Sequence, residues 1–285
     1  MNRYWVICTL LAVFIPAVYG AETVQQKSPF FALCMETHDE KKRSIEEQNE
    51  MLRELGFDGV AHLQLNGLPE RAASAKKLGL TVFQIYLRVN LNAEKPFDER
   101  LPEMLSHVRH QGTQLALLIY GGKPSDTTLD DKAVGIIQTI LDIAEPLGVH
   151  VVLYPHVNAW NEKISDCVRI AERFPDKKVG VMFNLCHWAA VDKSENLESV
   201  LRLAMPHLDA ITINGMDTPE EIQAKTGKWI QPLDAGSFDQ RKLLKILDDL
   251  DYCGPVGLQC YGLPGDARIH LERSVKKWKS LRSLQ

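Results

Sequence analysis

The sequence contains no Gly/Ser-rich linker, no low-complexity tract and no run of five basic residues. The missing linker indicates a single domain. The formal net charge is −4, with 33 Lys and Arg against 37 Asp and Glu, and phosphate binding needs a concentrated basic face. Nucleic acid is therefore not expected as a partner.

Cysteine is also scarce, and its spacing is irregular. One of the six cysteines, Cys8, lies in the apolar N-terminal stretch, which leaves an odd number in the remainder. Four of these five fall in expected strands, helices or strand ends: Cys34, Cys167, Cys186 and Cys260. This pattern indicates buried thiols, and we do not predict a disulfide framework.

The first twenty residues have the composition of a secretory signal. A short basic start, Met1 to Arg3, precedes the apolar stretch Tyr4 to Val18, and a small residue follows at Gly20. We predict a signal peptide over residues 1–20, a domain over 21–285, and export to the periplasm or the medium without stable membrane insertion. A membrane anchor is the alternative.

Short β-rich segments alternate with amphipathic helical segments along the remaining chain. The expected strands are 30–35, 59–65, 81–91, 114–120, 149–156, 179–186, 210–214 and 255–261. The expected helices are 41–55, 69–78, 98–110, 130–147, 161–173, 194–205, 238–250 and 266–281. Eight βα units predict a (β/α)8 TIM barrel. The alternative, an open doubly wound sheet, normally carries a glycine-rich turn after its first strand, and ALCMETHDEKK has no glycine.

The third expected strand supports closure of the sheet. In residues 83–91 apolar side chains (Phe83, Ile85, Leu87, Val89, Leu91) alternate with polar ones (Gln84, Tyr86, Arg88, Asn90). In a barrel the apolar set faces the surrounding helices and the polar set faces the interior and the mouth. An open sheet covered by helices on both faces would bury the polar set at a cost.

Polar side chains gather at the carboxyl ends of the expected strands, where TIM barrels place their functional residues. Four of the nine histidines lie there: His38, His62, His156 and His187. A single histidine at a strand end is more often structural, but four on one face favour a site. Glu36 lies beside His38, and Arg88 inside a barrel requires a carboxylate such as Glu36 or an anionic ligand. Trp160, Trp188 and Trp229 either stack on a sugar or anchor loops.

The second half of the chain resembles the xylose isomerase-like superfamily of sugar isomerases and epimerases related to endonuclease IV. The segments that carry the likeness are LYPH (153–156), FNLCHW (183–188), INGMD (213–217), IQPLDAGSFD (230–239) and GPVGLQCYG (254–262). The resemblance implies a site in which Glu, Asp, His and Glu hold one divalent metal and the two glutamates move a proton. At those positions this chain has Tyr154, Asn184, Asn214 and Gln259, while His156 and His187 beside them match the family.

Neutral oxygen ligands bind Mg²⁺ or Mn²⁺ weakly, so we predict no cofactor at the degraded ligand positions. The alternative keeps a divalent metal but places it at His38, His62, His156 and His187, a set that would favour Zn²⁺ over Mg²⁺. The predicted function is an isomerase, epimerase or lyase acting on a carbohydrate or keto-sugar. The predicted catalytic residues are His156, His187, Glu36 and His38, with Asp39 in the same cluster. The predicted substrate-binding residues are His62, Gln84, Arg88, Tyr154, Asn184, Trp188, Asn214 and Gln259. The alternative is a sugar-binding protein on an inactivated barrel; an endonuclease is least favoured, and the sequence does not specify the oligomeric state.

Overall fold

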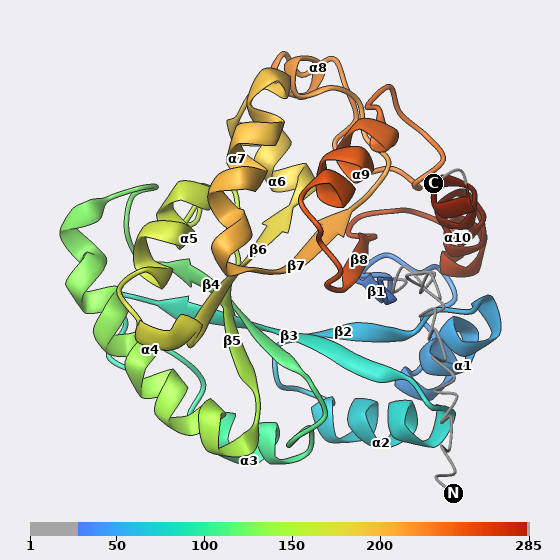
Figure 1. Ribbon diagram of the computed structural model, residues 1–285. Helices are drawn as coiled ribbons and strands as arrows, with labels where there is room; N and C mark the ends of the chain where they lie inside the picture. Colours follow the sequence, from blue (N-terminus) through green and yellow to red (C-terminus); the bar gives the residue numbers. More distant parts are fainter. Residues whose placement is uncertain (1–27, 284–285) are drawn as a thin grey trace, which may run out of the picture.

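The computed structural model describes residues 28–283, in which eight parallel strands close into a barrel in sequence order (Figure 1). The strands are β1 (Phe30–Leu33), β2 (Gly59–Leu63), β3 (Thr81–Asn90), β4 (Gln114–Tyr120), β5 (His150–Leu153), β6 (Val179–Asn184), β7 (Leu208–Ile213) and β8 (Val256–Gln259). β8 pairs with β1, so the barrel has no open edge. The predicted (β/α)8 barrel is confirmed, whereas the predicted signal peptide lies outside the described residues.

Helices surround the barrel on all sides (Figure 1). They are α1 (Ile45–Leu55), α2 (Leu68–Leu78), α3 (Leu101–Ser106), α4 (Asp130–Ala144), α5 (Ile164–Ala171), α6 (Leu185–Val191), α7 (Leu197–Ala204), α8 (Pro219–Gln223), α9 (Gln240–Asp249) and α10 (Ala267–Ser283). The sequence did not predict α6 and α8, which follow β6 and β7 and pack against each other. Within the described residues, no helix has the length and apolar character needed to cross a bilayer.

Local signals fix the ends of the best-defined helices. The Ser44 side chain accepts a hydrogen bond from the Glu47 amide, and the Glu47 carboxylate accepts one from the Ser44 amide, which starts α1 with a capping box. Gly56 ends the same helix in the left-handed conformation (φ 83°), where a side chain would be strained. The predicted helix 98–110 is shorter in the structure, Leu101–Ser106, with Pro102 in its first turn.

The alternation predicted for β3 holds with one correction. Ile85, Leu87 and Val89 join the outer core between strands and helices, and Tyr86 joins the barrel interior. Phe83, however, packs inside the barrel against Phe31, with ring centroids 5.1 Å apart. The pairing of β2 with β3 shifts register between Val60 and Ala61, opposite Val82 and Gln84. This bulge reverses the side-chain direction once and places Phe83 inside.

The barrel interior carries a polar chain below its mouth. The Gln84 amide nitrogen donates to Gln114 Oε1 (2.8 Å), and the Gln114 amide donates to the Asp209 carbonyl (3.1 Å). The Tyr86 hydroxyl donates to Gln84 Oε1 (2.7 Å) from above. Gln84 is therefore a satisfied core residue that fixes the direction of Tyr86, and it does not reach the mouth.

Candidate functional site

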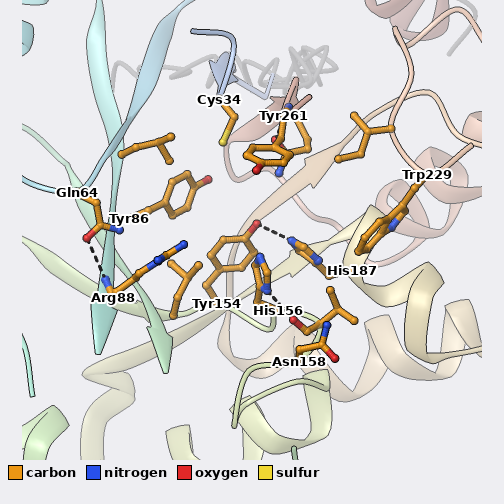
Figure 2. A pocket seen from close by; sticks show the side chains of 15 residues that line it. Cys34, Gln64, Tyr86, Arg88, Tyr154, His156, Asn158, His187, Trp229 and Tyr261 are labelled. Carbon is orange, nitrogen blue, oxygen red and sulfur yellow. Dashed lines mark hydrogen bonds between the residues drawn. The ribbon is translucent and has the colours of Figure 1, made fainter. Parts of the chain in front are cut away.

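A cavity of about 650 Å³ lies at the carboxyl end of the strands, a volume typical of small-molecule sites (Figure 2). Its walls are mainly aromatic and aliphatic. Among the described residues that line it, Arg88 alone carries a charge. The lining residues are Cys34, Leu63, Gln64, Tyr86, Arg88, Leu118, Tyr154, His156, Val157, Asn158, His187, Trp229, Ile230, Gln259 and Tyr261. Five predicted site residues belong to this set: Arg88, Tyr154, His156, His187 and Gln259.

Two histidine rings meet on one wall of the cavity. The ring centroids of His156 and His187 are 3.8 Å apart, and Tyr154 contacts both rings edge-on. His156 Nδ1 lies 2.8 Å from the Val157 carbonyl, which accepts only from a protonated nitrogen. The proton of neutral His156 is therefore on Nδ1, and its Nε2 keeps a free lone pair.

The partners of Tyr154 fix the other histidine. The Asn184 amide nitrogen donates to the Tyr154 hydroxyl (2.8 Å), so the hydroxyl hydrogen is free to donate to His187 Nε2 at 3.1 Å. Asn184 Oδ1 in turn accepts from the His187 amide (3.2 Å) and from the Cys186 thiol (3.0 Å). Asn184 thus lies behind Tyr154, orients it and caps α6.

This cap explains the segment FNLCHW. The strand was predicted to reach Cys186, but β6 ends at Asn184, whose side chain caps a helix that begins at Leu185. His187 therefore projects from the first turn of α6 and not from a strand end. The change of direction still brings its ring to the cavity.

Burial keeps this group of side chains uncharged. Burial lowers the pKa of His187 well below its usual value, and the neighbouring His156 lowers it further. The pKa of His156 is lowered by burial and, to a lesser extent, by Arg88. Burial raises the pKa of Tyr154 well above its usual value. At neutral pH the site therefore holds two neutral imidazoles and a protonated phenol.

The predicted cluster after β1 does not face the cavity. Burial raises the pKa of Glu36, and Arg71 opposes that shift. His38 is exposed, with its ring against Tyr261 at 5.6 Å. Asp39 is buried, pairs with Arg43 (2.9 Å) and accepts from the Ala267 amide, so it anchors the start of α10. The catalytic assignment of Glu36 and His38 is not supported by this placement.

Three further predicted substrate-binding residues are in the core. His62 points between β2 and the helices, and its Nε2 donates to the Asn66 carbonyl (2.9 Å). Asn214 is fully buried, and its amide nitrogen donates to the Gly215 and Trp229 carbonyls. Trp188 packs between Phe183 and Phe238, away from the cavity. None of these three residues lines the cavity.

Several lining residues were not in the predicted binding set. Trp229, which extends from the loop after β7, reaches over His187 with ring centroids 5.6 Å apart. Tyr261 is more than half exposed at the rim. Gln64 and Asn158 also line the cavity. Their backbones are left-handed (φ 61° and 64°), a conformation that residues other than glycine seldom adopt. Such local strain has no clear sequence signal.

Arg88 does not pair with Glu36, as the sequence suggested. Its guanidinium lies 5.8 Å from the centre of the Tyr120 ring, and within residues 28–283 no carboxylate lies within 4 Å of it. The positive charge near Glu36 is instead that of Arg71. Arg88 is thus an exposed cation in a cavity with otherwise neutral walls.

The residues at the family's metal positions do not fit a divalent cation. Tyr154 donates its hydroxyl hydrogen to His187, Asn184 Oδ1 accepts two hydrogen bonds, and Gln259 Oε1 accepts from the Tyr261 amide (3.0 Å). All are neutral, and hard cations are held chiefly by carboxylates. The four histidines of the zinc alternative are not brought together: the His38 ring lies against Tyr261, and His62 donates to the Asn66 carbonyl, whereas His156 and His187 pack on each other. In the described part of the chain, no three His, Cys, Asp or Glu side chains form a metal-binding group.

We therefore expect chelation to leave the melting temperature nearly unchanged. A site without anionic ligands contributes little binding energy to stability. Differential scanning calorimetry before and after dialysis against EDTA should show a shift under about 5 °C, equivalent to about 1–2 kcal/mol in a domain of this size. A larger shift that MnCl₂ or ZnCl₂ reverses would show that the ligands lie elsewhere.

We also expect His62 to contribute to acid destabilisation. Burial, with Arg71 nearby, lowers the pKa of His62 to about 4, so the unfolded chain binds the proton more strongly. Its contribution is present above pH 6.5 and is lost as the pH falls from 6.5 towards 4, by about 3 kcal/mol at most. In urea unfolding at several pH values, His62→Gln should flatten this loss. The exposed control His107→Gln should not, and an equal acid slope in both variants would contradict the assignment.

A sequence profile described as the xylose isomerase-like TIM barrel matches residues 49–278. The comparison with curated proteins gives no match. Among solved structures, 3-keto-D-glucoside 4-epimerase from E. coli is similar with a TM-score of 0.66 and 16% identity, covering 90% of this chain and 100% of that one. D-psicose 3-epimerase from Clostridium cellulolyticum H10 has a TM-score of 0.67 and 15% identity, with 90% and 98% covered. An AP endonuclease of family 2 from Brucella melitensis has a TM-score of 0.65 and 16% identity, with 85% and 96% covered. At these identities the likeness shows a shared fold.

Proposed function

The chain belongs to the xylose isomerase-like TIM barrel family, and from this premise we propose that it isomerises or epimerises a carbohydrate or keto-sugar without a metal. The observation that carries the proposal is the pair of neutral histidines, His156 and His187, in contact with Tyr154 on the cavity wall. Two structural neighbours are described as sugar epimerases. The aromatic lining suits the apolar faces of a sugar ring.

In this proposal His156 is the general base. Its Nδ1–H is held by the Val157 carbonyl, so the free Nε2 lone pair accepts the proton from the carbon next to the sugar's carbonyl. The C–H electron pair moves into the carbonyl and forms an enediolate. The Gln259 oxygen is occupied by the Tyr261 amide, which leaves the amide nitrogen to donate to that enediolate oxygen. His156 then returns the proton to the former carbonyl carbon, while the hydroxyl proton on the adjacent oxygen passes to the enediolate oxygen, so that the carbonyl moves by one carbon.

His187 and Tyr154 are positioning residues that hold the His156 ring in place. Hydrogen bonds from Asn184 to Tyr154 and from Tyr154 to His187 fix the rings of Tyr154 and His187 against His156. A positive charge on His156 is disfavoured by burial and by Arg88, which keeps its base form populated near neutral pH. When His156 takes up the substrate proton, the neutral His187 ring beside it adds no second charge.

Sugar binding is the first requirement of the proposal. Saturation-transfer NMR with a mixture of hexoses, pentoses and 3-keto-hexosides should show transfer to at least one sugar. Trp229→Ala should weaken that signal, since its ring lines the cavity and contacts the His187 ring edge-on, while Trp278→Phe at the opposite end of the barrel should not. No saturable transfer to any sugar would contradict the proposal.

One observation favours a second candidate, a sugar-binding protein without turnover. Among residues 28–283 no carboxylate lines the cavity, and the lowered pKa of His187 makes it a weak base. Both candidates require sugar binding, but only the first requires exchange of a carbon-bound hydrogen. Exchange therefore separates them.

We further propose that the protein is exported, on the basis of residues 1–20. Cleavage after Gly20 should yield a mature chain that begins at Ala21. Intact-mass measurement of the protein from the periplasm or medium of an expressing host tests this. A chain that still begins at Met1 would contradict export by this route.

A further inference from the structure

Arg88 has the features of a ligand-binding cation and lacks those of a structural one. Figure 2 shows its side chain directed into the cavity, toward Tyr86 and Tyr154. It is exposed there, and among the described residues no carboxylate is within ion-pairing distance. Two partly buried arginines elsewhere in the described residues are paired with carboxylates, Arg43 with Asp39 and Asp266, and Arg169 with Asp130 and Asp166.

The described side chains around Arg88 are neutral and leave its positive charge uncompensated. The histidines beside it are neutral, and the remaining lining is aliphatic, aromatic or amide. In the part of the chain that the structure describes, no acidic side chain lines the cavity to offset the positive charge. A cavity with low-dielectric walls and one sign of charge attracts a ligand of the opposite sign.

Donors beside Arg88 suit a planar anion. The Arg88 amide contacts Gln64 Oε1 at 3.5 Å, which holds the Gln64 side chain at the cavity wall with its amide nitrogen available. Gln64 reaches this place through a left-handed backbone (φ 61°), a conformation that is costly for glutamine. A guanidinium offers paired N–H donors that match a carboxylate, and the neighbouring amide adds a further donor.

We propose that the ligand is an acidic carbohydrate, a sugar carboxylate, whose carboxylate pairs with Arg88 while its ring lies toward His156 and Trp229. This inference deepens the proposed function and rests on it. A phosphate is the competing anion, but a dianion with one arginine would leave a charge uncompensated among neutral walls. A carboxylate carries the single charge that Arg88 balances.

The test compares matched acids, neutral sugars and phosphates by isothermal titration calorimetry. The probes are D-glucuronate and D-galacturonate, their parent hexoses, and D-glucose 6-phosphate. At least one uronate should bind about tenfold or more tightly than its parent, and its affinity should fall with added NaCl because Arg88 is exposed. Tighter binding of the phosphate than of either uronate would overturn the carboxylate assignment.

Variants locate the effect. Arg88→Gln should weaken uronate binding by about 10- to 100-fold, and Arg88→Lys by less, since lysine keeps the charge but not the paired donors. Neither variant should change binding of the parent hexoses by more than about threefold. The control Arg53→Gln removes the same charge at the end of α1, beside the opposite opening of the barrel, and should have no effect.

The outcomes also separate this inference from the proposed function. Hexoses that bind as well as uronates, with Arg88→Gln unchanged, would overturn the acidic ligand and leave sugar binding intact. No binding of any probe would count against both. A folded Arg88→Gln variant, verified by circular dichroism, is required for either conclusion.

Discussion

Replacing His156, the proposed general base, by glutamine should lower turnover by about 10²- to 10⁴-fold, the usual cost of losing one acid or base, and replacing the positioning residue His187 should lower it by a smaller factor. In His156→Gln the amide has no basic nitrogen to replace Nε2. In His187→Gln the amide oxygen can still accept from Tyr154, but the imidazole ring that packs at 3.8 Å from His156 is lost. The melting temperature of both variants should stay close to that of the parent. His107→Gln, on the surface at the end of α3, is the matched control.

The opposite pattern would assign both histidines a structural role. If His187→Gln lowers stability while turnover per folded molecule stays unchanged, the pair only joins neighbouring loops. Sugar binding without measurable turnover in the parent protein would favour the binding protein over the enzyme.

Trp160→Ala should cost about 3–5 kcal/mol of unfolding free energy, the range for deleting a buried aromatic side chain. Trp160 is fully buried, and its Nε1 donates to the Asp126 carbonyl (2.7 Å). Its amide also donates to the Ile119 carbonyl at the end of β4. Removal leaves a cavity beneath the loop at 121–129 and leaves the Asp126 carbonyl without this donor.

Trp229→Ala is the matched comparison, because Trp229 is only half-buried and lines the ligand cavity. Urea unfolding should show a loss of about 1 kcal/mol or less for this variant, while sugar binding weakens. Equal losses of stability in the two variants would contradict the division between a loop anchor and a ligand contact.

The barrel was predictable because its signals are local and repeated. Each βα unit carries its own apolar strand and helix, and the alternation in β3 distinguishes an interior from an exterior face. The predicted strand end in β6 and the predicted direction of Phe83 are wrong because a helix cap and a β-bulge interrupt the regular alternation. The Asn184 cap turns β6 into α6 two residues before the predicted end, and the bulge opposite Val60 and Ala61 turns Phe83 inward.

The site was predictable only in part, because chain direction changes after the strands. Tyr154, His156, Arg88 and Gln259 reach the cavity from the ends of their strands or just beyond them, and His187 reaches it from the first turn of α6. After β1, Cys34 adopts a left-handed backbone (φ 58°), so residues 36–39 turn away from the direction of the strand. A sequence gives no reliable sign of such a residue unless it is glycine.

One misplacement had a readable signal. Ala61 and Leu63 both face the barrel interior, so His62 between them must face the helices. The same period-two reasoning that succeeded in β3 would have excluded His62 from the site.

The central claim is metal-independent proton transfer on a sugar by the histidine pair. The most direct measurement is NMR of the bound sugar or uronate in D₂O with protein dialysed against EDTA. The account predicts deuterium at the carbon next to the carbonyl, at a rate that His156→Gln reduces by about 10²-fold or more. Binding without deuterium incorporation, or incorporation that appears only when a divalent metal is restored, would contradict it.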